Sequence, residues 1–288
     1  MADGHDPVAG GVLVGAMWSY AATVLYPAQA LKRTLGLRSR VTGEDPVSVP
    51  RPGLGPRFSV ACPDPVVLDG GSRHDHLVAA FDQMAEIYEA YVQPFSRPIV
   101  DEALDVLAPL LPSDARVLDL GCGPGRELQR LAGLVPRGEV VGVDLAAGMV
   151  VTAHRAARAH GLDHTAFFQA DAGDLPPTFA GAFDAAFTCL AHHHFPEPAR
   201  TAAAVRESLR PGGIYAIVDP GPAWYNAASA PLARRTDPGW VGFHTPDEFR
   251  GLLADAGFAR ASWREVLPGF GLVLAQRAPA EAGGGEAG

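Results

Sequence analysis

From residue 116 onward, apolar and polar residues follow two different periods, and each change of period marks a border between a strand and a helix. Five short apolar runs lie at 116–120, 139–144, 165–170, 183–190 and 212–219. Between them, apolar residues recur at helical spacing from about Gly125, Ala147 and Pro198. A helix at 246–256 and two closing strands at 260–267 and 270–277 follow. This order predicts an α/β fold with a seven-stranded, mostly parallel sheet and helices on both faces.

Residues 8–31 show a different pattern, because they carry no charged side chain. Four basic residues follow them: Lys32, Arg33, Arg38 and Arg40. The residues before this stretch are acidic, unlike the start of a secretory signal. Two interpretations stay open, a helix that is buried or forms a homo-oligomer, and a weak membrane contact through residues 8–40. Because the three cysteines form no CxxC pair, we expect a reducing compartment and a cytoplasmic protein.

The first quarter of the chain is predicted to lie outside the main domain. Six prolines between residues 43 and 75 exclude a long helix and predict an irregular linker. Helical spacing returns over 76–111, with a break expected near Pro94 and Pro98. We expect an N-terminal helical extension and linker over 1–75, a main domain over 76–277 and a disordered tail over 278–288.

The strand at 116–120 ends in an acid and runs into a glycine-rich turn. Asp119 is followed at alternate positions by Gly121, Gly123 and Gly125. Residues without a Cβ atom let the backbone turn tightly and approach a ligand at the carboxyl ends of the strands. A dinucleotide-binding turn requires GxGxxG, whereas Arg126 stands at the place of its third glycine. The spacing therefore disfavours NAD and FAD.

With this motif in its strand-turn-helix context, residues 114–277 resemble the class I S-adenosylmethionine (SAM) dependent methyltransferase family. The nearest types are the ubiquinone and menaquinone biosynthesis methyltransferases and related small-molecule enzymes. The resemblance covers over half of the chain. It implies a Rossmann-like fold and SAM as cofactor, with the glycine turn against the methionine part of SAM. It also implies that Asp119 helps to hold the SAM ammonium group.

Later residues extend the implied cofactor site. Asp144 ends the next strand, where a carboxylate can accept hydrogen bonds from both ribose hydroxyls; a helix N-cap is its alternative role. The resemblance places Met149 against the nucleoside, Asp171 near the adenine amino group and Ala172 in backbone contacts beside it. It also places Tyr88 over the cofactor, although aromatic residues on a helix equally belong to a core.

Three consecutive histidines at 192–194 follow the strand at 183–190, where donor and acceptor would meet. Adjacent side chains point in different directions, so all three cannot face one site. Residues 220–245 form an insertion rich in aromatic residues, which we expect to be an acceptor lid or a loop anchored on the core. His193 and His244 are the candidate general bases, if the acceptor has to lose a proton. No metal site is expected, since the histidines lack accompanying acids or cysteines.

The net charge of −9, without an extended basic run, disfavours a nucleic-acid partner. We therefore expect methyl transfer from SAM to carbon or oxygen of a small, apolar organic acceptor, in small-molecule biosynthesis. Two other classes stay open. One is an enzyme that binds SAM but catalyses a different reaction, such as a cyclisation. The other is a non-catalytic subunit that its N-terminus attaches to a partner or a membrane.

Overall fold

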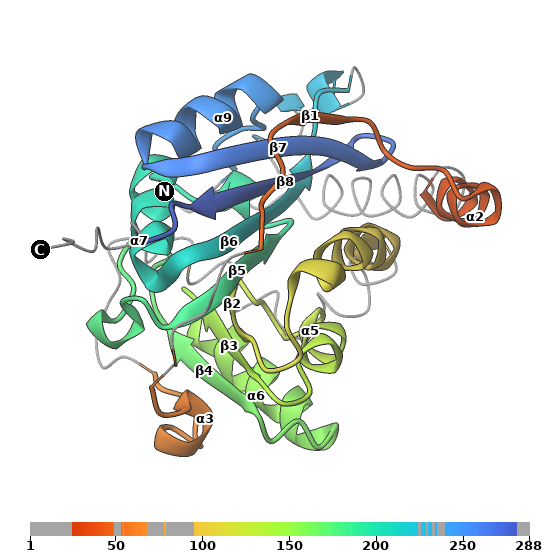
Figure 1. Cartoon of the computed structure of the whole chain (residues 1–288). Coiled ribbons are helices and arrows are strands. Elements are labelled where there is room, and N and C mark those ends of the chain that lie inside the picture. The colour runs from red at the N-terminus through yellow and green to blue at the C-terminus, as the bar shows by residue number, and fades with distance from the viewer. Residues whose placement is uncertain are drawn as a thin grey trace, which may run out of the picture.

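The computed structural model describes residues 25–48, 53, 55–67, 78, 95–223, 226–228, 230, 231, 234 and 240–280. An eight-stranded sheet in the order β1-β7-β8-β6-β5-β2-β3-β4 forms its centre (Figure 1). The parallel part consists of β2 (Arg116–Leu120), β3 (Glu139–Asp144), β4 (Thr165–Gln169), β5 (Phe183–Cys189) and β6 (Leu209–Pro220). The antiparallel part consists of β8 (Phe270–Arg277), β7 (Phe258–Leu267) and β1 (Val41–Gly43).

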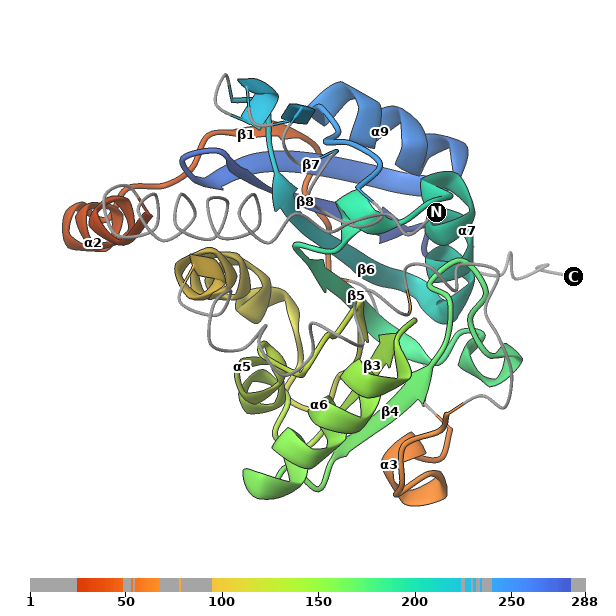
Figure 2. The ribbon, with the colours of Figure 1, turned by 180° about the vertical axis from the view of Figure 1, so that it is seen from behind.

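Helices cover both faces of the sheet (Figures 1 and 2). On one face, residues 95–107, α5 (Leu128–Leu134) and α6 (Ala147–Ala159) contribute to one apolar cluster with the strands. On the other face, α7 (Pro198–Ser208) and α9 (Pro246–Asp255) contribute to a second cluster. The parallel strands are buried between these two layers, which is why their sequences are continuous apolar runs.

The predicted α/β class is confirmed, and the seven predicted strands lie within three residues of their expected limits. The sheet has an eighth strand, because Val41–Gly43 pairs with β7 and aligns Val41 with Arg264. Beyond β1, the side chain of Asp45 accepts a hydrogen bond from Ser262 Oγ at 2.6 Å and pairs with Arg264. Three residues are too short a segment to show strand periodicity, so the pattern of the sequence did not reveal them.

The predicted break near Pro98 is wrong, because residues 95–107 are helical through this proline. Proline removes one backbone donor but keeps its carbonyl, and the carbonyl of Pro98 accepts a hydrogen bond from Gln29 Nε2 at 3.3 Å. Pro94 lies outside the described residues. Helix α5 begins at Leu128, three residues after the predicted start at Gly125, because the glycine turn continues to that point.

The segment before residue 75, predicted to be a linker, makes ordered contacts with the sheet. Phe58, in α3 (Phe58–Ala61), stacks on Phe183 with 5.7 Å between the ring centroids. Val66 forms a parallel bridge with Phe168 of β4, and its carbonyl accepts the Gln169 amide at 2.7 Å. The segment therefore reaches both margins of the sheet, because it forms the outer strand β1 beside β7 and contacts the other outer strand, β4, through Val66.

Helix α2 (Tyr26–Leu35) is held against residues 95–107 by ion pairs. Glu102, which is 5% exposed, lies 2.7 Å from Lys32 and 3.0 Å from Arg33. Within the described part of the chain, no helix combines the length and the apolar character needed to cross a membrane.

Candidate functional site

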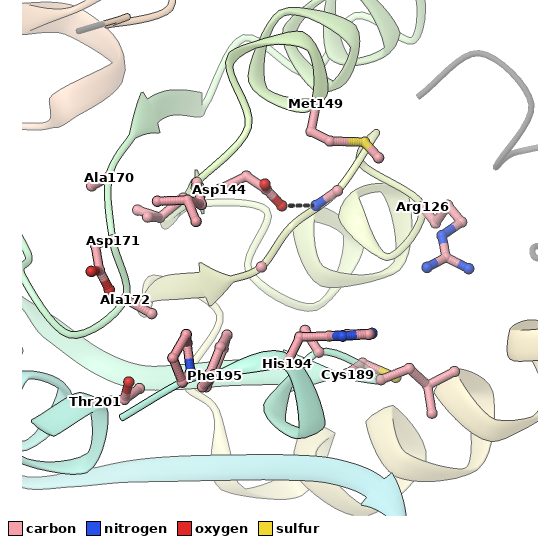
Figure 3. Close-up of a pocket in the computed structure, with 17 residues that line it drawn as sticks. Arg126, Asp144, Met149, Ala170, Asp171, Ala172, Cys189, His194, Phe195 and Thr201 are labelled. Atoms are coloured by element: carbon pink, nitrogen blue, oxygen red, sulfur yellow. Dashed lines mark hydrogen bonds between the residues drawn. The ribbon is translucent and has the colours of Figure 1, made fainter. Parts of the chain in front are cut away.

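A pocket opens at the carboxyl ends of β2, β3, β4 and β5, and encloses about 830 Å³ of empty space, part of it open to solvent. This is the edge where open α/β sheets bind ligands. Six of the predicted cofactor residues line it: Gly121, Gly123, Asp144, Met149, Asp171 and Ala172. Figure 3 shows the side chains of Asp144, Met149, Asp171 and Ala172 around the pocket. The structure thus brings together residues that are up to 51 positions apart.

The three glycines of the turn have left-handed backbone conformations, with φ of 65° at Gly121, 52° at Gly123 and 86° at Gly125. A Cβ atom at Gly121 would lie 2.7 Å from Ala191 Cβ, and one at Gly125 would lie 3.2 Å from Ala153 Cα. A Cβ at Gly123 would meet no protein atom within 4 Å. Two of the glycines therefore permit close packing inside the protein, whereas Gly123 leaves space in the pocket.

Asp144 joins the ends of β2 and β3. Its Oδ2 accepts the backbone amide of Gly123 at 2.9 Å, and its Oδ1 accepts the amide of Ala146 at 2.9 Å. The N-cap of α6 is Ala146, so Asp144 is not the capping residue that the alternative interpretation required. Each oxygen of an ionised carboxylate has a second acceptor position, so the side chain can bind a ligand as well.

Asp171 and Met149 both line the pocket. Asp171 Oδ1 accepts the amide of Gly173 at 2.8 Å, a short-range bond that fixes the turn after β4. Met149 is 2% exposed in the first turn of α6, and Ala172 is 9% exposed. These contacts hold the walls of the pocket in place.

Two buried carboxylates lie close to the glycine turn. Asp119 is 2% exposed and Glu127, at the N-cap of α5, is 4% exposed. Asp119 Oδ2 and Glu127 Oε1 have no hydrogen-bond partner among the described residues. Burial raises the pKa of Asp119 well above its usual range, and the charges of Glu127 and Asp144 raise it further. Burial also raises the pKa of Glu127, against the lowering effect of Arg126.

Glu127 was missed by the sequence analysis, although an acid two residues after the last glycine was visible there. Its neighbour Arg126 lines the pocket and donates from Nη1 to Ser96 Oγ at 2.8 Å. Asp119 and Gly125 are not among the residues that line the described pocket. The two acids therefore lie behind the glycine turn, next to Arg126, whose charge opposes the effect of burial on the pKa of each.

The histidines follow β5 in a single 3-10 turn, His192–His194, after Leu190, which has a positive φ of 53°. His194 lines the pocket, and the ring of His193 lies 4.2 Å from the His194 ring, centroid to centroid. Burial lowers the pKa of His192 to about 4, with smaller contributions from neighbouring groups. His194 therefore faces the pocket, His193 lies beside it, and His192 is enclosed in the protein.

The two candidate bases lie beside the pocket, and neither is among the residues that line its described part. His193 Nδ1 lies 2.7 Å from Asp219 Oδ1, and the amide of Val241 donates to the His193 carbonyl at 2.8 Å. His244 stacks on His192, with 5.2 Å between the ring centroids. Tyr88 lies outside the described residues. The part of the chain that the structure describes holds no cluster of three metal-ligating side chains.

Comparison with known proteins adds to this geometry. Residues 117–213 match the methyltransferase domain family. Nocamycin O-methyltransferase of Saccharothrix syringae is 36% identical over 144 residues, 49% of this chain and 50% of that protein. Trans-aconitate 2-methyltransferase of Deinococcus radiodurans is 32% identical over 193 residues, 65% of this chain and 68% of that protein. The chain belongs to the class I SAM-dependent methyltransferase family.

A solved structure agrees with this assignment. The DhpI–SAH complex is 26% identical to this chain, with a TM-score of 0.57 over 72% of this chain and 100% of that one. SAM is the cofactor of the family, as the sequence analysis expected. The chain spans half the length of the nocamycin relative.

Proposed function

We propose that this protein transfers a methyl group from SAM to oxygen or carbon of a small organic acceptor. The observation that carries the proposal is a pocket at the strand ends, where the glycine turn, Asp144 and Asp171 meet. Its residues fit SAM in two independent ways. Gly123 leaves space that a side chain would fill, and the orphaned acceptors of Asp119 and Glu127 suit an ammonium group.

In this proposal, SAM lies along the pocket and the predicted site residues bind its parts in turn. Asp144 would accept the ribose hydroxyls, and Asp171 and Ala172 would contact the adenine ring. Met149 would pack against the nucleoside, and Tyr88 keeps its proposed place over the cofactor. Asp119 and Glu127 would hold the ammonium group at the glycine turn. When bound, SAM supplies an activated methyl group on a sulfonium, so the protein has mainly to align donor and acceptor.

The acceptor is proposed to lie between the histidine turn and residues 220–245. In the described part of this segment, Trp240 packs edge-on against Phe243 with 5.3 Å between the ring centroids. Arg234 lies 5.2 Å from the Trp240 ring. The Phe243 ring lies edge-on to the His193 ring, with 5.8 Å between the ring centroids. An aromatic lid would exclude water from the reacting atoms and favour an apolar acceptor.

The names of the relatives support a small organic acceptor. One is an O-methyltransferase of nocamycin and the other a methyltransferase of trans-aconitate, so both act on small molecules. They favour methyl transfer over the cyclase and the non-catalytic subunit considered from the sequence. We place the reaction in small-molecule biosynthesis in the cytoplasm.

Residues 8–40 keep their two proposed roles, contact with a second copy of the chain or with a membrane. Of this segment, α2 is described, and it exposes 56% of Leu31 and 59% of Leu35. Light scattering and flotation with anionic vesicles, on the full chain and after deletion of residues 1–40, separate the two roles. An unchanged mass and an unchanged flotation after deletion would contradict both.

Calorimetry and label transfer test the proposed reaction. Asp144→Ala removes a charged acceptor of the ribose hydroxyls and should weaken SAM binding more than tenfold. Asp163→Ala, at a side chain that is 85% exposed, is the matched control and should leave the affinity unchanged. Incubation of the parent protein with methyl-labelled SAM and small hydroxylated acceptors should yield a labelled product. Tight SAM binding without transfer to any acceptor would contradict methyl transfer.

A further inference from the structure

Helix α2 turns its polar side chains toward the protein. The side chain of Gln29 donates to the carbonyl of Pro98 at 3.3 Å. Lys32 Nζ and Arg33 Nε lie 2.7 and 3.0 Å from the buried carboxylate of Glu102. Positions that are three and four residues apart share one face of a helix, so these three polar side chains lie together. The polar face, which a surface helix normally presents to water, is therefore used to attach α2 to the protein.

The opposite face of α2 is apolar and exposed. Leu31 follows Gln29 by two positions, which turns it to the other side of the helix, and Leu35 lies one turn beyond it. Their side chains are 56% and 59% exposed, and Leu37, directly after the helix, is 53% exposed. Large apolar side chains that gather at the surface mark a site of interaction. We call Leu31, Leu35 and Leu37 the leucine face.

Positive charge borders the leucine face. Arg38 and Arg40 follow it in the chain and are exposed, and neither forms an ion pair within the described part of the chain. The next acids in the chain, Glu44 and Asp45, pair instead with arginines of β7. An apolar face with basic residues at its border is complementary to a lipid surface that is rich in phosphate.

A second copy of the chain fits the leucine face less well than a membrane does. Two-fold symmetry brings the same patch of both molecules together, so the arginines of one copy would gather beside those of the other. Like charges at such a short distance oppose association. A stable interface between proteins also takes about 20–30 residues a side, many more than the leucine face and its two arginines provide.

Helix α2 lies on the pocket side of the sheet. Lys32 Nζ donates to the carbonyl of Val266 at 3.0 Å, near the end of β7. This end of β7 is level with the carboxyl end of β6, because Phe270 of β8 aligns with Leu267 on one side and with Pro220 on the other. Figures 1 and 2 show α2 on the side where β7 ends. A surface that contacts α2 is therefore near the edge of the sheet that holds the pocket.

We propose that α2 binds the surface of an anionic membrane, with the leucine face among the lipid chains and with Arg38 and Arg40 on lipid phosphates. This deepens the proposed function, because it selects one of the two roles of residues 8–40 and names the residues and the lipid charge. The docked protein holds its pocket edge close to the bilayer. The proposal does not depend on which atom the protein methylates.

Flotation of the full chain tests the proposal, with vesicles of phosphatidylcholine alone and of phosphatidylcholine mixed equally with phosphatidylglycerol. The parent should bind the mixed vesicles at least tenfold more tightly than the neutral ones, because the arginines contribute only at an anionic surface. Leu31→Gln with Leu35→Gln should weaken binding to the mixed vesicles at least tenfold. Arg38→Gln with Arg40→Gln should weaken it about tenfold and bring the affinities for the two kinds of vesicle close together.

Val60→Gln and Arg155→Gln are the matched controls and should bind both kinds of vesicle as the parent does. Val60 is 78% exposed in α3, and Arg155 is exposed in α6, so both lie on elements other than α2. All the substituted side chains are exposed, so every variant should keep the melting temperature of the parent.

Three outcomes would overturn the proposal. The first is a parent protein that does not float with the mixed vesicles, and the second is equal flotation of the parent and of the leucine variant. The third is a parent that light scattering shows to be a dimer and that becomes a monomer in the leucine variant, which would assign the leucine face to a second copy. None of these measurements involves methyl transfer, so failure here leaves the proposed reaction unaffected.

Discussion

The carboxylate of Asp144 accepts the backbone amide of Gly123 at 2.9 Å, so the acid at the end of β3 holds the glycine turn that follows β2. The two strands are parallel neighbours and align Leu120 with Val143 just before this contact. The turn therefore has its shape before a ligand arrives, which lowers the entropy lost on binding. Asp144 consequently has two functions, one toward the protein and one proposed toward ribose.

Comparison of Gly123→Ala with Gly161→Ala should distinguish the effect of a filled ligand pocket from the effect of backbone strain. Gly123 and Gly161 have similar positive φ values, 52° and 67°, and a Cβ at either position meets no protein atom within 4 Å. Alanine should therefore cost about 1–2 kcal/mol of stability at both. Gly123→Ala alone should also weaken SAM binding, by at least tenfold, because its Cβ enters the pocket. Calorimetry with SAM measures this, and equal affinities in the two variants would show that Gly123 does not face the cofactor.

Asp119→Asn should stabilise the protein without ligand, increasingly so as the pH rises. The pKa of Asp119 is raised in the folded state, so the protonated carboxyl group stabilises the folded protein. This stabilisation is fully present below pH 3.8, the pKa of an aspartate in the unfolded chain. That contribution is lost as the pH rises through the folded value. The melting temperature of Asp119→Asn should thus exceed that of the parent by more at pH 8 than at pH 5, while SAM binds more weakly. A difference that shrinks between pH 5 and pH 8 would argue against a buried charge at this position.

The variant His192→Phe should lose less stability than the parent protein when the pH falls from neutral to acid. Burial lowers the pKa of His192 from 6.5 to about 4, and the side chain is 1% exposed. Its contribution to stability is therefore complete above pH 6.5 and is lost as the pH falls toward 4, about 3 kcal/mol in total. Phenylalanine can keep the ring contacts with His244 and Phe249 and has no proton to gain.

Urea unfolding at pH 4.5 and 7.5 measures this effect for the parent, His192→Phe and His160→Gln. His160 is exposed at the end of α6, so its variant should retain the parent's dependence on pH. If His192→Phe loses as much stability between the two pH values as the parent does, His192 is not the group responsible.

The central strands were predictable because burial on both faces leaves a continuous apolar run, as in RVLDL at 116–120. The strand-end acids were predictable because parallel strands bring their carboxyl ends to one edge, which placed Asp144 and Asp171 in one pocket. The place of Tyr88 stays a prediction. The domain limits at residues 75 and 277 also remain predictions.

The remaining features depend on contacts between distant residues. The His193–Asp219 pair arises where the left-handed turn at Leu190 brings the histidines to the end of β6, and no local pattern signals such a turn at a leucine. Glu127 became a candidate only when its burial and its orphaned oxygen were visible. Strand β1 exists because β7 offers backbone partners to it, and not because of its own sequence.

The contacts of residues 41–66 with β7 and with β4 have a consequence for solubility. An uncovered outermost strand exposes a row of amides and carbonyls that recruits strands from other molecules and starts aggregation. Here one stretch of chain covers the two long strands that would otherwise be outermost, β7 through Val41–Gly43 and β4 through Val66, and leaves only the three-residue β1 at the edge beyond β7. A shortened chain that begins after residue 66 would retain every pocket residue and yet lose its protection against self-association.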